Sequence, residues 1–401
     1  MTTATLVFDP FSEDFFNGPY ETYRRMREEA PVYYHEQLDF YALTRHADVA
    51  AAYKDYESYS SARGVDLAMV RKGEVTEHGS IIAMDPPQHR HMRSLLNKVF
   101  TPRAIQAQLP MVEALIDKYL SRLDPSGFDM VQDFSALFPV EVITNMQGVP
   151  EEDSQRVRLW IDTLLHRESG EVEMNEAGTK AAIDMAIYYY KLTKQRRLEL
   201  GDDLLSKLIT SEIERENGEM DALTNIEITE FATLLGGAGA ETVTKLLGNA
   251  AVVFAQNPEQ WQKLQDDRSK IPFAVEELLR YEAPAQYNVR CSLREITLHG
   301  VTIPAGKPVF LVGGSANRDP EAWTDPDKFD VDRDRTEAQN LGLGYGIHSC
   351  LGAALARMES AVALEKLLDF MPRFEVDWDG CKRVNMQNVA GWSNVPVRVL
   401  R

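Results

Sequence analysis

The sequence predicts a mainly helical protein that also contains smaller β-sheets. Helical spacing of apolar residues dominates from Pro102 to Gln256, and one helix in this region, starting at Thr224, is unusually long. Short strand-like segments occur in the first third of the chain and again after Pro284. The 401 residues are 44% hydrophobic and 26% charged, which is enough apolar material for a large core.

The first third of the chain mixes strands and helices. Phe40 to Thr44 is typical of a strand, and a helical pattern follows from about His46 to Asp55. Beyond Pro102 the pattern is mainly helical. One expected helical face there contains Ile105, Leu109, Val112, Ile116 and Tyr119.

The long helix has recognisable ends and an unusual middle. Thr224 followed by Glu227 fits a capping box, and Asn257-Pro258 marks the end. Three glycines in its middle, Gly236, Gly237 and Gly239, cost roughly 1 kcal/mol each relative to alanine. They indicate either close packing against a neighbouring helix or a local opening where a flat ligand approaches the backbone, and the helix alone favours neither.

The remainder of the chain returns to strands. Strand-like segments run from Val289 to Leu298 and from Val309 to Val312, joined by a turn at Ile303 to Gly306. A helix is expected after Cys350, and strand-like alternation from Phe374. Because no linker, low-complexity tract or internal repeat interrupts the sequence, we expect a single domain over residues 1–401.

The charge balance excludes some partners. Lys and Arg total 43 against 62 Asp and Glu, a formal net charge of −19, which argues against a nucleic-acid-binding surface. The sequence has no signal-peptide pattern at its start and no apolar run long enough to cross a bilayer. We therefore expect a cytoplasmic protein, a monomer, with neither nucleic acid nor membrane as a partner.

Cysteine usage singles out one segment. The three cysteines, Cys291, Cys350 and Cys381, fit neither a disulfide framework nor zinc-ligand spacing. Cys350 stands apart because Gly344, Gly346 and Gly352 surround it and allow the backbone to turn tightly around a sulfur. Amides at the start of the following helix would stabilise a thiolate. Cys291 and Cys381 are interpreted as small buried residues.

The segment from Leu343 to Gly352 resembles the cysteine-ligand loop of the cytochrome P450 family, Phe-Gly-x-Gly-x-His-x-Cys-x-Gly. Leu343 replaces the usual phenylalanine, which puts the iron potential and the sulfur donation in question but not the ligand. The resemblance implies the cytochrome P450 fold, with haem b between the long central helix and this loop and Cys350 as the iron ligand. It also places Gly344, Gly346 and Ala238 against the haem.

Other segments match the same family in the expected order. Ala238 to Thr242 resembles the oxygen-binding groove, which implies that Thr242 hydrogen-bonds bound dioxygen and a relay water and that Glu241 connects the site to bulk protons. By the same resemblance, the haem propionates are held by four residues: His89, Arg93, Arg290 and His348.

Glu277 to Arg280 resembles the Glu-x-x-Arg element of the family. We expect Glu277 and Arg280 to form a buried ion network with Arg333 that holds the Cys350 loop. This role is structural and not catalytic.

The resemblance implies a monooxygenase that inserts one oxygen atom from O2 into a hydrophobic small molecule such as a terpenoid, steroid or fatty acid. Electrons would come from NAD(P)H through ferredoxin reductase and ferredoxin. Candidate pocket residues are Leu234, Val289 and Trp392, together with the loop from about Ala62 to Ala83. The candidate docking residues Arg90, Lys98, Arg103 and Arg357 are singly more typical of solvated surface charge.

Three alternatives stay open at this point. A peroxygenase would use hydrogen peroxide directly, although such relatives generally lack the acid and threonine found at Glu241 and Thr242. A haem-based sensor would bind a ligand without ferredoxin-supported turnover. A substrate delivered on a carrier protein would need an open or basic entrance.

Overall fold

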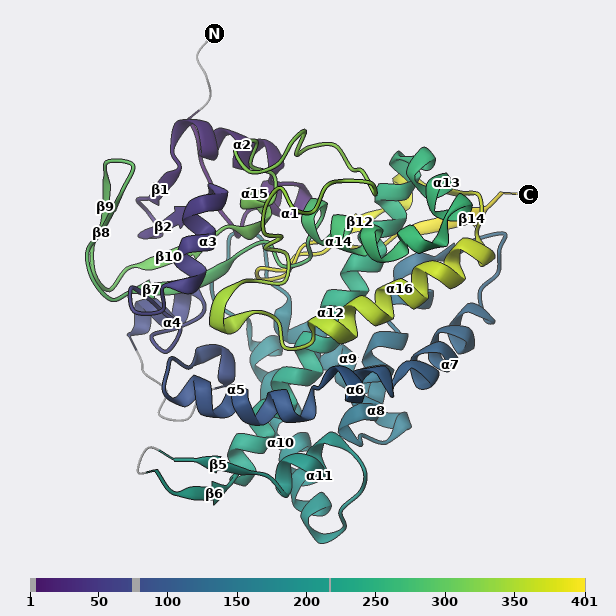
Figure 1. Ribbon diagram of the computed structural model, residues 1–401, viewed down its shortest axis with the longest axis horizontal. Helices are drawn as coiled ribbons and strands as arrows, with labels where there is room; N and C mark the ends of the chain where they lie inside the picture. Colours follow the sequence, from purple (N-terminus) through teal and green to yellow (C-terminus); the bar gives the residue numbers. More distant parts are fainter. Residues whose placement is uncertain (1–4, 74–79, 216–217, 401) are drawn as a thin grey trace.

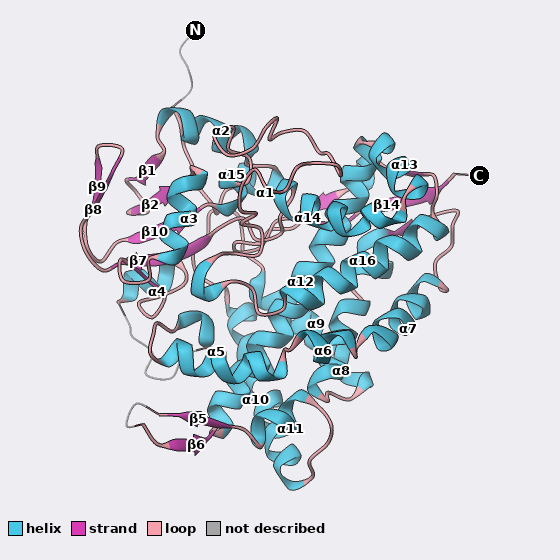
Figure 2. Ribbon diagram, viewed as in Figure 1, coloured by secondary structure: helices cyan, strands magenta, loops and turns pink. Residues whose placement is uncertain are grey.

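The computed structural model describes residues 5–73, 80–215 and 218–400. Its longer helices cover the lower and right-hand parts of the molecule, while most strands gather at the left (Figures 1 and 2). The helices are α1 Glu13–Asn17, α2 Tyr20–Glu29, α3 His46–Lys54, α4 Leu67–Lys72, α5 Gln88–Val99, α6 Pro102–Gln106, α7 Leu109–Leu120, α8 Phe138–Gln147, α9 Glu151–Leu165, α10 Glu176–Leu198, α11 Leu204–Ile209, α12 Asn225–Gln256, α13 Pro258–Asp266, α14 Ile271–Tyr281, α15 Gly313–Ala316 and α16 Ala353–Phe370.

The largest sheet joins the two strand-rich parts of the sequence. Its order is β1-β2-β10-β7-β3, with β10 parallel to β2 and the other neighbours antiparallel. Smaller sheets join β11-β14-β4, β12-β13, β5-β6 and β8-β9. The strands are β1 Val32–His35, β2 Phe40–Leu43, β3 Tyr59–Ser60, β4 Phe128–Asp129, β5 Glu212–Glu214, β6 Met220–Ala222, β7 Asn288–Ser292, β8 Ile296–Leu298, β9 Val301–Ile303, β10 Pro308–Leu311, β11 Phe374–Val376, β12 Lys382–Arg383, β13 Trp392–Asn394 and β14 Pro396–Val399.

Helix α12 is the axis of the helical part. Thr224 caps it, since the hydroxyl accepts from the Glu227 amide and the Glu227 carboxylate accepts from the Thr224 amide, so the predicted capping box is confirmed. Most of its second half is buried. In Figure 1, α12 accordingly lies in the middle of the molecule, with α16 in front of it. No helix within the described ranges is long and apolar enough to cross a membrane.

One expected helix is divided in two. The apolar face expected to start at Ile105 lies on α6 and α7, which are separated at Ala107 and Gln108. Pro110 occupies the first turn of α7, where a residue without an N–H is tolerated, and it therefore marks a new helix start. Ile105, Val112 and Ile116 are nevertheless buried in the same core.

Candidate active site

The Cys350 loop folds around its cysteine through backbone hydrogen bonds. The Cys350 amide donates to the Leu343 carbonyl at 2.9 Å, and the Ser349 amide donates to the Gly346 carbonyl at 3.1 Å. Gly344 and Gly346 have φ values of 68° and 72°, a region that favours glycine. A β-carbon at Gly346 would in addition collide with the Tyr53 carbonyl, so this loop needs glycine there.

Residue Cys350 is exposed, although many protein atoms surround its thiol. Burial raises its pKa, while the Gly352 amide, Arg93 and Arg357 each lower it. The amide contribution agrees with the prediction from sequence, but burial outweighs it. A coordinated metal ion deprotonates a thiol outright, so an accessible sulfur in such a loop fits a metal ligand.

Four nitrogen-bearing side chains lie beside this loop. His89 and Arg93 come from α5, Arg290 from β7, and His348 from the loop itself. The His89 and His348 ring centroids are 4.2 Å apart, and the Arg93 guanidinium donates to the Ser349 carbonyl at 2.7 Å. Burial lowers the pKa of His89 to about 4 and that of His348 to about 3. A carboxylate bound beside these rings would oppose this effect and favour the protonated form, in which both ring nitrogens of each imidazole donate.

The nitrogens of this group include atoms without hydrogen-bond partners. The Nε2 atoms of His89 and His348 are both buried and unpartnered among the described residues. Buried Arg290 donates to its neighbour's carbonyl at Val289. Because buried polar atoms are normally satisfied, these donors fit the carboxylates of a bound group. A haem that is bound through Cys350 and carries two propionates fits this set.

A cavity of about 300 Å³ adjoins these residues. Val289, Arg290, Gly344 and His348 all line it, so the structure brings together one expected pocket residue and three expected cofactor residues. Its wall also contains these residues, of mixed polarity: Tyr53, Val65, Asp66, Ile82, Leu165, Tyr287, Asn288, Gln387 and Asn388. Part of the loop expected to line the pocket, residues 74–79, lies outside the described residues.

Leu234, Ala238 and Thr242 share one face of α12 at four-residue spacing. Ala238 is exposed, although the helix around it is mostly buried. The Thr242 hydroxyl donates to the Ala238 carbonyl at 3.0 Å. This face is open enough to receive a ligand at the position where the sequence predicts one.

The three glycines in the middle of α12 serve packing in two cases. A β-carbon at Gly239 would lie 2.9 Å from the Ile143 side chain, and one at Gly236 would lie 2.8 Å from the Tyr189 hydroxyl. Gly237 has open space beside it. The α12 helix is continuous through this region, which supports the packing explanation over a local opening of the helix.

Glu241 is buried, and its carboxylate forms an ion pair with Lys245, one turn further along α12. Both residues line a second pocket of about 590 Å³, together with Asp162 and Arg158 of α9. Sequence reasoning missed Lys245 and Asp162. The spacing of Glu241 and Lys245 is itself the signal of a helical ion pair, whereas nothing local indicates Asp162.

Trp392, which the sequence predicts in the substrate pocket, is not among the described residues that line the cavity at Val289. Its ring stacks on the Arg383 guanidinium, at 3.8 Å from the ring centroid. Arg383 lines the pocket that contains Glu241, so Trp392 borders that pocket through Arg383.

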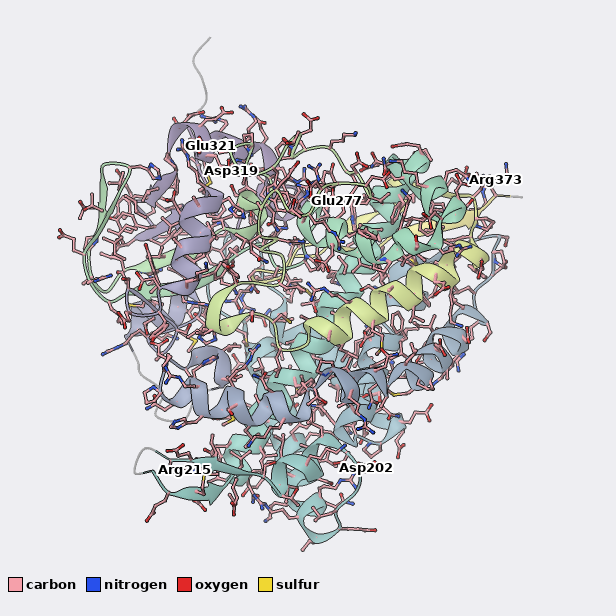
Figure 3. All side chains as sticks on the ribbon, viewed as in Figure 1. Asp202, Arg215, Glu277, Asp319, Glu321 and Arg373 are labelled. Atoms are coloured by element: carbon pink, nitrogen blue, oxygen red, sulfur yellow. The ribbon has the colours of Figure 1, made fainter. Side chains whose placement is uncertain are left out.

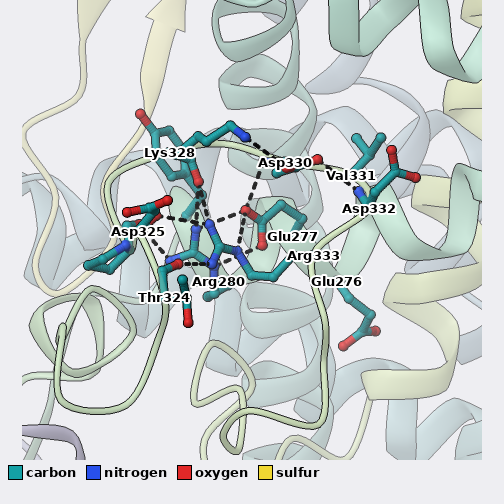
Figure 4. A network of polar contacts seen from close by, with 12 residues as sticks. Glu276, Glu277, Arg280, Thr324, Asp325, Lys328, Asp330, Val331, Asp332 and Arg333 are labelled. Atoms are coloured by element: carbon teal, nitrogen blue, oxygen red, sulfur yellow. Dashed lines mark hydrogen bonds and ion pairs between the residues drawn. The ribbon is translucent and has the colours of Figure 1, made fainter.

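The predicted ion network is present. Arg280 and Arg333 both donate to the Glu277 carboxylate, at 2.8 Å and 3.0 Å, and all three side chains are almost fully buried. Figure 4 shows both guanidinium groups pointing at Glu277 and reaching the backbone carbonyl of Lys328. In Figure 3, Glu277 lies inside the molecular outline, whereas Asp202 and Arg215 lie toward its lower edge.

Known proteins similar to the whole chain bear on the identity of this site. The family model described as Cytochrome P450 matches residues 171–391. The chain belongs to the cytochrome P450 family. A cytochrome P450 of Mycobacterium tuberculosis, numbered 123, is 40% identical over 396 residues, covering 98% of this chain and 97% of the relative.

Solved cytochrome P450 structures agree with this assignment. A mutant of P450 EryK in complex with erythromycin B has a TM-score of 0.87 at 31% identity, covering 96% of each chain. CYP109E1 from Bacillus megaterium in complex with testosterone has a TM-score of 0.86 at 30% identity, covering 97% of this chain and 99% of that one. The predicted cytochrome P450 fold is thereby confirmed, and the protein is a haem b monooxygenase.

Proposed function

We propose that Cys350 is the iron ligand of this monooxygenase and that His89, Arg93, Arg290 and His348 hold the haem propionates. The observation that carries this proposal is the pair of buried, unpartnered Nε2 atoms beside an accessible cysteine in a glycine loop. Bound haem supplies the activation of dioxygen and accepts the electrons. The protein supplies ligation, orientation and protons.

Thr242 and Glu241 are the proposed proton-delivering pair. The Thr242 hydroxyl donates to Ala238, which leaves its oxygen free to accept a hydrogen bond from a relay water. Glu241 directly precedes Thr242 on α12 and lines the pocket of about 590 Å³. A peroxygenase or a sensor needs no such pair, so its presence supports the monooxygenase that uses O2 and electrons from a partner.

Replacing Thr242 tests this role. In Thr242→Ala we expect product per electron pair to fall by about 10-fold to 100-fold, with peroxide released instead, because a positioned proton donor contributes at least that much. Thr242→Ser keeps the hydroxyl and is expected to restore coupling. Coupled turnover in Thr242→Ala would contradict the assignment.

We infer a hydrophobic substrate in the size range of macrolides and steroids. Val289, Ile82 and Leu165 contribute apolar side chains to the cavity beside the proposed propionate residues. Similar structures hold erythromycin B and testosterone, and a relative of Salinispora arenicola, 35% identical and covering 88% of this chain and 89% of the relative, is named cyclomarin C epoxidase. Titrating the ferric holoenzyme with macrolides, steroids and fatty acids tests this, with a shift to high spin expected for the first two classes. A shift with fatty acids alone would contradict it.

We propose that a ferredoxin delivers the electrons. Arg90, Lys98 and Arg103 are exposed on α5 and α6, which lie near the Cys350 loop and α16 in Figure 1. Arg357 of α16 is less available because it forms an ion pair with Glu276. Charge reversal at Lys98 should therefore weaken reduction by ferredoxin more strongly at low ionic strength than at high.

A further inference from the structure

Helix α10 carries a row of apolar side chains on its outer side. Its inner side chains Met185 and Tyr189 are fully buried where α10 packs on α9 and α12. On the opposite side, Ile183, Ile187 and Tyr190 are 54%, 48% and 40% exposed. Neighbouring exposed apolar side chains of this size indicate a surface that another molecule covers.

The spacing of the outer side chains is that of a coiled-coil seam. Steps of four and three residues alternate through six exposed residues of α10: Glu176, Lys180, Ile183, Ile187, Tyr190 and Lys194. This alternation keeps the side chains on one line along the helix, where a second helix can contact all of them. We call these six residues the α10 seam.

The order of side chains along the α10 seam matches a second copy of the same helix that runs in the opposite direction. When the two-fold axis passes beside residue 185, Ile183 of each copy lies opposite Ile187 of the other. The same alignment places Glu176 opposite Lys194, and Lys180 opposite the ring of Tyr190. An ion pair, a cation–π contact and an apolar contact therefore each occur twice.

A parallel arrangement of two copies is disfavoured by the same residues. Each side chain would then lie opposite itself, so Glu176 would face a carboxylate, and Lys180 and Lys194 would each face an ammonium group. Like charges opposite one another across a helix pair repel. Only the antiparallel pairing joins opposite charges along the whole α10 seam.

The local contacts of the α10 seam leave it available for such a pairing. Lys180 pairs with Asp184 one turn further along, and these side chains are 74% and 38% exposed. Lys194 Nζ lies 5.9 Å from the centre of the Tyr190 ring. Exposed contacts of this kind contribute little to stability, so both lysines can also contact a partner.

We propose that the α10 seam is the interface of a symmetric dimer, in which α10 of one copy packs antiparallel against α10 of the other. This goes beyond the proposed chemistry of the haem site and does not depend on it. A contact between two helices buries less than the roughly 1,600 Å² of a standard interface, so we expect a weak dimer whose population depends on concentration. Such a dimer replaces the monomer that is expected from the sequence.

Sedimentation equilibrium of the purified holoenzyme tests the association itself. Over about 1 to 100 μM, a range that reports weak binding, we expect the average mass to rise from that of one chain toward that of two. The mass of a single chain at every concentration overturns the proposal. The α10 seam would then fit a different occupant, such as a carrier protein or a membrane surface.

Charge reversal tests which surface forms the dimer. Glu176→Lys and Lys194→Glu each place like charges opposite one another at two points of the symmetric dimer. Each variant alone should therefore raise the dissociation constant at least about 10-fold. An equimolar mixture of the two variants should dimerise again, because every contact then joins a carboxylate to an ammonium group.

Lys54→Glu is the matched control, because it makes the same charge change at an exposed position on α3, which contacts α15 and β10. It should dimerise as the wild type does. A dimer that both reversals on α10 leave intact would contradict the α10 interface. A loss of dimer that mixing fails to restore, or that Lys54→Glu shares, would contradict the antiparallel pairing of Glu176 with Lys194.

Discussion

The rings of His89 and His348 lie with their centroids 4.2 Å apart, and the buried Nε2 atom of each lacks a hydrogen-bond partner among the described residues. These residues are far apart in the sequence and come from α5 and from the Cys350 loop. Leaving two adjacent buried donors unsatisfied costs about 1–3 kcal/mol each. A carboxylate placed between them would remove that cost.

His89→Leu should weaken haem retention. A hydrogen bond to a charged group contributes about 1.5–3 kcal/mol, so we expect haem to dissociate at least about 10-fold faster. The rate is measured by transfer of haem to an excess of apomyoglobin. His91→Leu, on the same helix, is the control and should dissociate at the wild-type rate. Equal rates for wild type and His89→Leu would contradict the assignment of His89 to a propionate.

Gly346→Ala should disrupt the Cys350 loop far more than a comparable change elsewhere. Gly300→Ala is the matched control, because Gly300 has a similar φ of 77° but open space where a β-carbon would lie. Both variants carry the left-handed strain of about 1–2 kcal/mol, but only Gly346→Ala also collides with Tyr53. We expect normal haem content in Gly300→Ala and a large loss in Gly346→Ala, measured by absorbance per protein. Equal haem content in the two would contradict this account of the loop.

Glu277→Gln should destabilise the fold. The change leaves two buried guanidinium groups, Arg280 and Arg333, without their carboxylate, which costs about 3–5 kcal/mol. Urea unfolding measures this free energy. Glu21→Gln removes an exposed partner of Arg24 and should cost less than about 1 kcal/mol. A similar small loss for both variants would show that the network contributes little.

Asp162 should make the free energy of unfolding depend on pH. Burial raises its pKa to about 7 in the folded protein, against about 3.9 in an unfolded chain. Between those values the folded state binds more protons, so stability falls as pH rises from about 4 to about 7. Asp162→Asn should flatten this part of the pH profile, whereas Asp184→Asn should leave it unchanged. A profile unaltered by Asp162→Asn would contradict the raised pKa.

Local patterns in the sequence were enough to predict much of the fold. The capping box at Thr224 and the boundary at Asn257-Pro258 defined the long helix correctly, because caps and proline act through neighbouring residues. The division between α6 and α7 was missed, since apolar periodicity continues across it. The pairing of β2 with β10 was also beyond local reasoning, because the two strands are distant in the sequence.

Some residues of the candidate site could also be predicted from local sequence, and others could not. The Cys350 loop, the Glu277–Arg280 pair and the His89–Arg93 pair on α5 are spacing patterns within short segments, so the sequence predicts them. Asp162 meets Glu241 only because α9 packs against α12, and its proximity has no local signal. The polar wall contributed by Asn288 and Gln387 is likewise a product of tertiary packing.

The ligand role of Cys350 is tested most directly by the absorption spectrum of the reduced, carbon-monoxide-bound holoenzyme. We predict the red-shifted Soret band of a thiolate-ligated haem in the wild type and in Cys381→Ser, whose sulfur lies on the loop before β12. In Cys350→Ser this band should be replaced by that of a haem without a thiolate, or the haem should be lost. A thiolate-type band that survives in Cys350→Ser would contradict the assignment of the iron ligand.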